Sequence, residues 1–295
     1  MKKNIKKKNV LYIIFFIILI YFFFINLRDS LFVKKKDRLN ILFYNQKTAF
    51  YSFGFADGVN YFIPFPADIK VLIPGGFGYY RLGALGKLVE LEKKPLLYQK
   101  SFSAITSSFL DFYFYPPNNE IFFGKETPSQ IFLPTVKQIW ISKSNANLFD
   151  KTYIFFLFLM QQKNQFIQLT NLALKENTNE EILDEKLFFD RLIGFFYKKT
   201  YRNEEDTVQI IYTKKENNAS LLANIIEGEG IRVVDLSYQP ATIINKCQII
   251  ISEVDLSQTA RALNRFFDCP ITKGKTGAYD IIFKLGKKEE DWRVE

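Results

Sequence analysis

Residues 10–27 read VLYIIFFIILIYFFFINL, and this stretch decides how the rest of the chain is arranged. It holds no charged residue, and Asn26 is its one strongly polar residue. As a helix it would span about 27 Å, close to the hydrocarbon thickness of a bilayer. A cleaved secretory signal has a shorter apolar core that ends in small residues, whereas here Asn26 and Leu27 lead into Arg28. The stretch therefore predicts a retained transmembrane helix.

Basic residues flank the predicted span on both sides. They are Lys2, Lys3, Lys6, Lys7 and Lys8 before it, and Arg28, Lys34, Lys35, Lys36 and Arg38 after it. Asp29 and Asp37 dilute the second group, and long C-terminal segments cross membranes largely regardless of their charge. We therefore expect a single-pass protein of the cell membrane, with its N-terminus in the cytoplasm and its C-terminal domains extracytoplasmic.

The overall basicity of the chain belongs to these flanks. Residues 1–38 carry ten lysines and arginines against two aspartates, a net of +8, so only +1 of the chain's +9 is left for the remainder. A nucleic-acid-binding domain shows a basic face on its folded part. The lipid bilayer is therefore an expected partner, and nucleic acid is not.

Composition removes several kinds of catalytic site. The chain has no histidine, which excludes Ser-His-Asp and Cys-His nucleophilic sites and H-E-x-x-H zinc sites. Its two cysteines, Cys247 and Cys269, cannot supply a four-thiolate metal site. Carboxylate, arginine or hydroxyl chemistry remains, or no chemistry at all.

Strand and helix patterns alternate after residue 38. Short apolar runs bounded by Pro and Gly predict strands at residues 39–44, 59–63, 69–73 and 110–115, and helical spacing predicts a helix at 82–91. Residues 152–160 are apolar but too short to cross a bilayer, so we expect a buried helix or strand. Residues 175–185 are polar and charged and predict a loop. This alternation favours an α/β layered domain at 39–205.

The pattern is clearest in residues 206–295. Strands are predicted at 208–212, 231–236, 248–252 and 279–285. One helix follows a cap at Asn217 or Asn218, and another follows a cap at Asp255 or Ser257. These elements predict a small C-terminal α/β module behind the layered domain, with residues 1–38 forming the cytoplasmic tail, anchor and linker.

Cys247 and Cys269 flank a predicted strand and helix of this module. The helix should return antiparallel across the strand, which brings its end near the start of the strand. An extracytoplasmic location permits oxidation. A disulfide between the two is therefore a candidate, and two buried free thiols are the alternative.

Two regions of the chain, one on each side of residue 205, carry a family resemblance. PADIKVLIPG at residues 66–75, followed by YYRL at 79–82, resembles the P-R-D-x-x-V-x-I-P-G segment of LytR-CpsA-Psr domains. LNIL at 39–42 resembles the family's opening strand, and LDFY at 110–113 its later strand. VQIIY at 208–212, GIRVV at 230–234, ARAL at 260–263 and DIIFKLG at 280–286, with Asp291 and Trp292, resemble the LytR C-terminal domain.

This resemblance implies a bacterial cell-envelope protein. LytR-CpsA-Psr domains transfer glycopolymers from a polyprenyl-pyrophosphate carrier to the cell wall, and arginines clamp the pyrophosphate. Cell-wall polymers or envelope proteins are therefore the implied partners. A membrane-bound transcriptional regulator, a third class, would need a basic DNA-reading element that this chain lacks.

The arginines depart from the family pattern. Ala67 stands where the motif's leading arginine belongs, and residues 39–205 contain only Arg81, Arg191 and Arg202. Asp68 and Arg81 are the candidate ligand-binding residues, and no catalytic or metal-binding residue is assigned. The sequence favours a degenerate domain that binds or scaffolds without catalysis and needs no cofactor. The alternative is an active transferase of the LytR-CpsA-Psr type, in which Mg²⁺ would assist.

Overall fold

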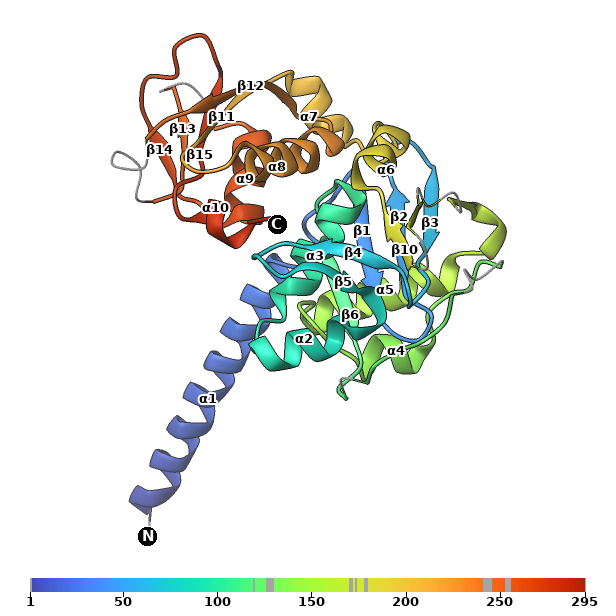
Figure 1. Ribbon diagram of the computed structural model, residues 1–295. Helices are drawn as coiled ribbons and strands as arrows, with labels where there is room; N and C mark the ends of the chain where they lie inside the picture. The colour runs from blue at the N-terminus through green and yellow to red at the C-terminus, as the bar shows by residue number, and fades with distance from the viewer. Residues whose placement is uncertain are drawn as a thin grey trace.

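The computed structural model describes residues 2–118, 120–125, 130–169, 172, 174–177, 180–240, 246–252 and 256–294. A helix, α1 (Lys2–Arg28), projects from a body of two lobes (Figure 1). Its apolar side chains from Tyr12 to Ile25 are exposed. Within the described residues, no helix is long and apolar enough to cross a membrane. The span expected over residues 10–27 is therefore not supported here and stays a prediction.

The first lobe contains a six-stranded mixed sheet. Its order is β7-β6-β1-β2-β3-β8. The strands are β1 (Arg38–Phe43), β2 (Ala49–Gly54), β3 (Asn60–Pro64), β6 (Phe112–Tyr115), β7 (Lys143–Ser144) and β8 (Phe166–Gln168). The strands expected at 39–44, 59–63 and 110–115 are confirmed. Strand β2 was missed because all six of its residues are buried, so its sequence lacks the apolar-polar alternation of a half-exposed strand.

A second sheet of the same lobe corrects one expectation. Its order is β5-β4-β10-β9, from β4 (Lys70–Ile73), β5 (Gly78–Arg81), β9 (Leu174–Asn177) and β10 (Glu180–Leu183). The loop expected at 175–185 was wrong, since β9 and β10 form an antiparallel pair there. Backbone pairing of Ile182 with Lys70 and burial of Leu183 hold this polar segment in the sheet.

Helices cover the sheets of the first lobe. They are η1 (Leu82–Ala84), α2 (Leu85–Glu92), α3 (Leu96–Thr106), α4 (Val136–Trp140), α5 (Leu148–Met160), η2 (Lys163–Gln165), α6 (Glu185–Leu192) and α7 (Lys199–Glu204). The apolar run at 152–160 is helical, as α5, but only part of it is buried. Ile154 and Phe158 face the core, whereas Leu159 and Met160 are exposed.

The second lobe is an α/β module, as the sequence predicts. Its sheet order is β12-β11-β15-β13-β14. The elements are β11 (Thr207–Tyr212), α8 (Glu216–Gly228), β12 (Arg232–Tyr238), β13 (Gln248–Ile251), α9 (Gln258–Phe267), β14 (Ile271–Lys273), β15 (Ile281–Lys284) and α10 (Lys288–Asp291). The mixed α/β fold class is thereby confirmed.

The two helix caps expected in this module have different outcomes. The Ser257 hydroxyl accepts a hydrogen bond from the Ala260 amide and caps α9, while the alternative, Asp255, lies outside the described residues. Neither Asn217 nor Asn218 caps α8, which begins at Glu216. Asn218 is instead buried, and its side-chain oxygen accepts a hydrogen bond from the Val294 amide at 3.0 Å.

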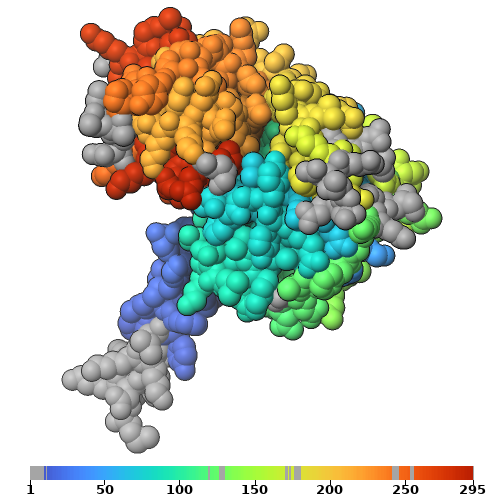
Figure 2. Space-filling view, viewed as in Figure 1, coloured from blue at the N-terminus to red at the C-terminus, as the bar shows by residue number. Residues whose placement is uncertain are grey.

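The two lobes pack closely, and α1 leaves the body beneath the line where they meet (Figure 2). Ala104 and Phe109 of the first lobe belong to the core cluster of the second. Phe109 stacks on Phe266 of α9, with ring centroids 4.1 Å apart. A Cβ at Gly228 of α8 would lie 1.6 Å from the carbonyl oxygen of Ser107, so only glycine permits this approach.

Candidate functional site

The structure brings the two predicted ligand-binding residues together. Asp68 lies in the loop between β3 and β4, and Arg81 is the last residue of β5. Pairing of Lys70 with Arg81 across β4 and β5 places the arginine beside this loop. The Arg81 Nη1 atom lies 3.7 Å from Asp68 Oδ1, and the guanidinium lies over the Phe123 ring at 4.3 Å. We call these two residues the motif pair.

Asp68 also fixes the neighbouring loop. Its Oδ2 accepts a hydrogen bond from the Gly124 amide at 3.2 Å, and its own amide donates to the Gly124 carbonyl at 3.1 Å. Its Oδ1 is buried and has no hydrogen-bond partner in the described part of the chain. Across that same part, no three carboxylates or thiolates come together in a group that could hold a metal ion.

Position 67 has no room for the family's leading arginine. Ala67 is buried in the core cluster of the first lobe. Its carbonyl accepts a hydrogen bond from the Gly83 amide at 2.7 Å, and a Cβ at Gly83 would lie 2.9 Å from the Ala67 Cβ. Substitution by arginine would bury a long charged side chain in this packed space.

Several other cations of the first lobe already have partners. The Arg202 guanidinium lies over the Tyr197 ring at 5.0 Å. The Lys87 ammonium lies 2.6 Å from Glu90 on the exposed side of α2, and Arg191 and Lys70 each have a partner. Arg81 is the arginine that approaches Asp68, and this carboxylate offsets its charge.

A mostly apolar cavity of about 400 Å³ has Phe122 in its wall, next to Phe123, whose ring lies over Arg81. Phe43, Tyr44, Phe114 and Phe122 form part of its wall. The Tyr44 hydroxyl accepts a hydrogen bond from the Gly86 amide at 2.9 Å, which fixes that ring. Burial raises the pKa of Tyr44 above its ordinary value, so the hydroxyl stays protonated. The cavity can accept an apolar group, and it was not predicted from the sequence.

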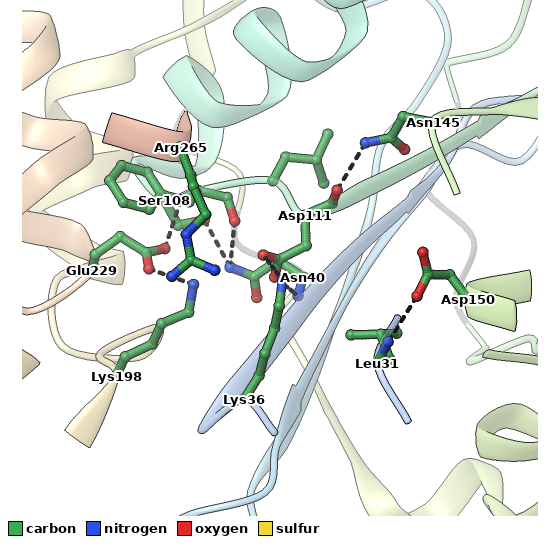
Figure 3. A network of polar contacts seen from close by, with 12 residues as sticks. Leu31, Lys36, Asn40, Ser108, Asp111, Asn145, Asp150, Lys198, Glu229 and Arg265 are labelled. Carbon is green, nitrogen blue, oxygen red and sulfur yellow. Dashed lines mark hydrogen bonds and ion pairs between the residues drawn. The ribbon is translucent and has the colours of Figure 1, made fainter. Parts of the chain in front are cut away.

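A second cluster of charges lies where the two lobes meet, and sequence reasoning missed it (Figure 3). Lys36 Nζ lies 2.5 Å from Asp111 Oδ1, and Lys198 Nζ lies 2.7 Å from Glu229 Oε2. Asp111 Oδ2 accepts a hydrogen bond from the Asn40 amide, and Glu229 Oε1 accepts one from the Phe109 amide at 2.6 Å. We call Lys36, Asp111, Lys198 and Glu229 the junction cluster.

The junction cluster is mostly shielded from water. The side chains of Lys198 and Glu229 are 8% and 0% exposed. Burial alone would lower the pKa of Lys198, but the charges of Asp111 and Glu229 outweigh it and raise that pKa. Burial alone would raise the pKa of Asp111, but Lys198 and Lys36 outweigh it and lower that pKa. Lys198 and Asp111 are therefore both ionised at neutral pH.

Cys247 and Cys269 form a disulfide in the structure. Their Cα atoms are 5.4 Å apart, within the range that the bond requires. The bridge ties the start of β13 to the segment after α9, the arrangement expected from the order of these elements.

Comparisons with known proteins give only distant structural neighbours. No protein-family model matches the chain, and no curated protein matches it. Among solved structures, TagT of B. subtilis matches with 12% identity and a TM-score of 0.36, over 53% of this chain and 88% of that one. YwtF (TagT), described as a LytR-CPS2A-psr family protein with bound octaprenyl pyrophosphate lipid, matches with 12% identity and a TM-score of 0.35, over 52% and 87%.

A third neighbour is the transcriptional regulator yvhJ from Bacillus subtilis. It has 10% identity and a TM-score of 0.34, over 53% of this chain and 94% of that one. The structural neighbours thus include LytR-CpsA-Psr proteins. At these TM-scores the likeness carries no argument about the activity of this chain.

Proposed function

We propose that the chain is a membrane-anchored protein of the bacterial cell envelope that binds a cell-wall or glycopolymer component without transferring it. The observation that carries this proposal is the motif pair. One arginine lies there, opposite a carboxylate and stacked on Phe123. The position of a second arginine is the buried Ala67.

Transfer from a pyrophosphate carrier requires more positive charge than this. Pyrophosphate is held by several cations, and arginine suits it because its planar fork gives two charge-assisted hydrogen bonds to phosphate oxygens. The pair of Arg81 and Asp68 has no net charge. Such a site suits a neutral, hydroxyl-rich polymer better than a pyrophosphate, since carboxylate and guanidinium groups bond readily to hydroxyls.

Co-sedimentation tests the binding role. The full-length protein, in a neutral detergent, is mixed with purified bacterial cell wall and centrifuged. We expect retention of the wild type and at least a severalfold loss with Asp68→Ala/Arg81→Ala. A matched control, Glu90→Ala/Lys87→Ala, removes an exposed ion pair elsewhere in the same lobe and should bind as the wild type does. Equal retention of all three proteins would contradict a binding role for the motif pair.

The proposed anchor is α1, inserted with the rest of the chain extracytoplasmic. Its apolar residues 10–27 and the disulfide support this topology, because disulfides persist in oxidising compartments. A cysteine placed at the exposed Asn118 should react with an impermeant thiol reagent on whole cells. The wild type, whose cysteines are both in the disulfide, is the unlabelled control. Labelling that needs cell lysis would reverse the proposed orientation.

One observation favours the alternative, an active transferase. Asp68 Oδ1 is buried without a hydrogen-bond partner in the described chain, and carboxylate oxygens are ligands that Mg²⁺ accepts. In that case Asp68 would hold the metal and Arg81 would contact the pyrophosphate. A direct assay of transfer separates the two proposals.

A further inference from the structure

A cavity of about 460 Å³ opens at the junction of the two lobes. The linker after α1, the segment between α3 and β6, α7 and α9 all contribute to its wall. Five cationic side chains line it, and they are Lys34, Lys35, Lys36, Lys198 and Arg265. Two acidic side chains, Asp37 and Asp111, line it as well. Positive charge therefore exceeds negative charge in the wall by three.

The acidic side chains of this wall are already satisfied. Asp111 contacts Lys36 through one oxygen and accepts the Asn40 amide hydrogen through the other. Asp37 Oδ2 accepts hydrogen bonds from both the amide and the hydroxyl of Thr200, each at 2.6 Å. These carboxylates hold the protein together and are not directed at a ligand.

Two of the cations, by contrast, have no acidic partner among the described residues. Lys35 is exposed in the linker, and Arg265 is exposed on α9. The Nε atom of Arg265 donates to the Arg261 carbonyl at 3.3 Å, which leaves its two Nη groups without a hydrogen-bond partner in the part of the chain that the structure describes. Figure 3 shows Arg265 directed toward the junction cluster. Lys198, at the inner end, stays charged because its pKa is raised.

The position of the cavity indicates which anion it meets. Lys36 follows Arg28, the last residue of α1, by only eight residues, so the cavity lies within about 28 Å of the helix end. Figure 2 shows α1 leaving the body beneath this same junction. If α1 spans the bilayer as proposed above, the cavity lies on the membrane-facing side of the body, within reach of the lipid headgroups.

We propose that this cavity binds the phosphate of an anionic phospholipid headgroup, with Arg265 and Lys35 as its principal contacts. Arginine can present two parallel N–H groups to phosphate oxygens, and lysine adds a compact point charge. Basic side chains next to a membrane-spanning helix are attracted to anionic lipids. The site would fix how the two lobes sit on the membrane, and it is separate from the motif pair.

The test uses the full-length protein in a neutral detergent and three soluble probes. These are dihexanoyl phosphatidylglycerol, dihexanoyl phosphatidylcholine and inorganic phosphate, titrated by calorimetry at low ionic strength. We expect the phosphatidylglycerol to bind at least tenfold more tightly than either other probe. Lys35→Gln/Arg265→Gln should weaken it by roughly tenfold or more, because two charge-assisted contacts are lost. Added salt should weaken wild-type binding.

A matched control exists in the second lobe. Arg232→Gln/Lys273→Gln also removes one arginine and one lysine from exposed positions, and it should bind phosphatidylglycerol as the wild type does. If the test variant melts at a lower temperature than this control, the single variant Lys35→Gln replaces it, because Lys35 lies in the exposed linker. We then expect the affinity for phosphatidylglycerol to fall by about threefold or more.

Three results would overturn the proposal. The first is that the test variant and the control bind phosphatidylglycerol with equal affinity. The second is that the wild type binds phosphatidylcholine as tightly as phosphatidylglycerol, and the third is that it binds inorganic phosphate as tightly as phosphatidylglycerol. The last would mark a site for free anions. Failure of cell-wall co-sedimentation would refute the proposed function and leave this result standing, since the two tests use different residues and ligands.

Discussion

The motif pair and the junction cluster differ in almost every physical respect. The motif pair joins two partly exposed side chains, 26% and 33% exposed, at 3.7 Å. The junction cluster joins four ionisable side chains from the linker, the first lobe and the second lobe, in two pairs at 2.5–2.7 Å, with Glu229 fully buried. A family motif pointed to the motif pair. The family-like stretch at 110–113 includes Asp111, but nothing in the sequence indicated that Asp111 joins Lys36, Lys198 and Glu229.

This difference shows that the residues with the most recognisable sequence motif are not the residues that hold the lobes together. Exposed ion pairs contribute little to stability, because water screens them and two side chains must be ordered. Breaking a buried pair is costly, because the remaining charge stays in a poorly solvated site. We therefore expect the junction cluster to govern stability and the motif pair to govern ligand binding.

The largest effect should come from Lys198→Met. It leaves Glu229 and Asp111 without their shared cation, and we expect the free energy of unfolding to fall by about 3–5 kcal/mol. Urea denaturation of the detergent-solubilised protein measures it. The neighbouring exposed Lys199 supplies the control, because Lys199→Met should change stability by less than about 0.5 kcal/mol. If Lys198→Met lowered the free energy of unfolding as little as this control does, the junction cluster would not stabilise the fold more than the motif pair does.

The next largest effect should come from Asp111→Asn, and it should depend on pH. The lowered pKa of Asp111 means that its ionised form stabilises the fold above about pH 3.8, the ordinary value, and that this contribution is lost as pH falls through the folded-state pKa. We expect a loss of about 1.5–3 kcal/mol at pH 7. In denaturation at several pH values, the difference from wild type should shrink below pH 3.8; a pH-independent difference would contradict the assignment.

Gly228→Ala should separate the lobes. Alanine normally stabilises a helix relative to glycine by up to about 1 kcal/mol, but here its Cβ would collide with the Ser107 carbonyl. We expect a net loss of about 1–3 kcal/mol and faster proteolysis near the junction. A stabilised variant would show that α8 does not approach Ser107 so closely.

The smallest effect on stability should come from Arg81→Ala. Its ion pair is long and partly exposed, so we expect a loss of at most about 1 kcal/mol, including the contact with Phe123. Binding to cell wall should fall in the same variant. A destabilisation comparable with that of Lys198→Met would make the motif pair a structural element.

Sequence predicted the second lobe better than the first for a physical reason. Strands such as β11 and β15 are short apolar runs bounded by polar turns, and Ser257 occupies a standard capping position. In the first lobe, β2 is buried on both faces, and β9 and β10 are polar. None of these three strands therefore shows the apolar-polar alternation of a half-exposed strand. The sequence pattern predicts a cap at Asn217 or Asn218, whereas Asn218 is buried and accepts a hydrogen bond from Val294, which is distant in sequence.

The motif pair could be predicted because its residues lie in one short segment with a family pattern. The junction cluster could not be predicted, because its contacts join distant parts of the chain. Asp111 is 75 residues from Lys36, and Phe109, whose amide donates to Glu229, is 120 residues from it. Lys35 and Lys36 looked like an ordinary membrane flank. Their place beside α9 follows only from the packing of the two lobes.

The central claim is that the motif pair binds without transferring. The direct measurement incubates the full-length protein with a polyprenyl-pyrophosphate-linked glycan, a cell-wall acceptor and Mg²⁺, and follows release of polyprenyl phosphate. The account predicts no release above that of the Asp68→Ala/Arg81→Ala variant. Turnover by the wild type that is lost in Asp68→Ala or Arg81→Ala would contradict it and would identify the protein as an active transferase.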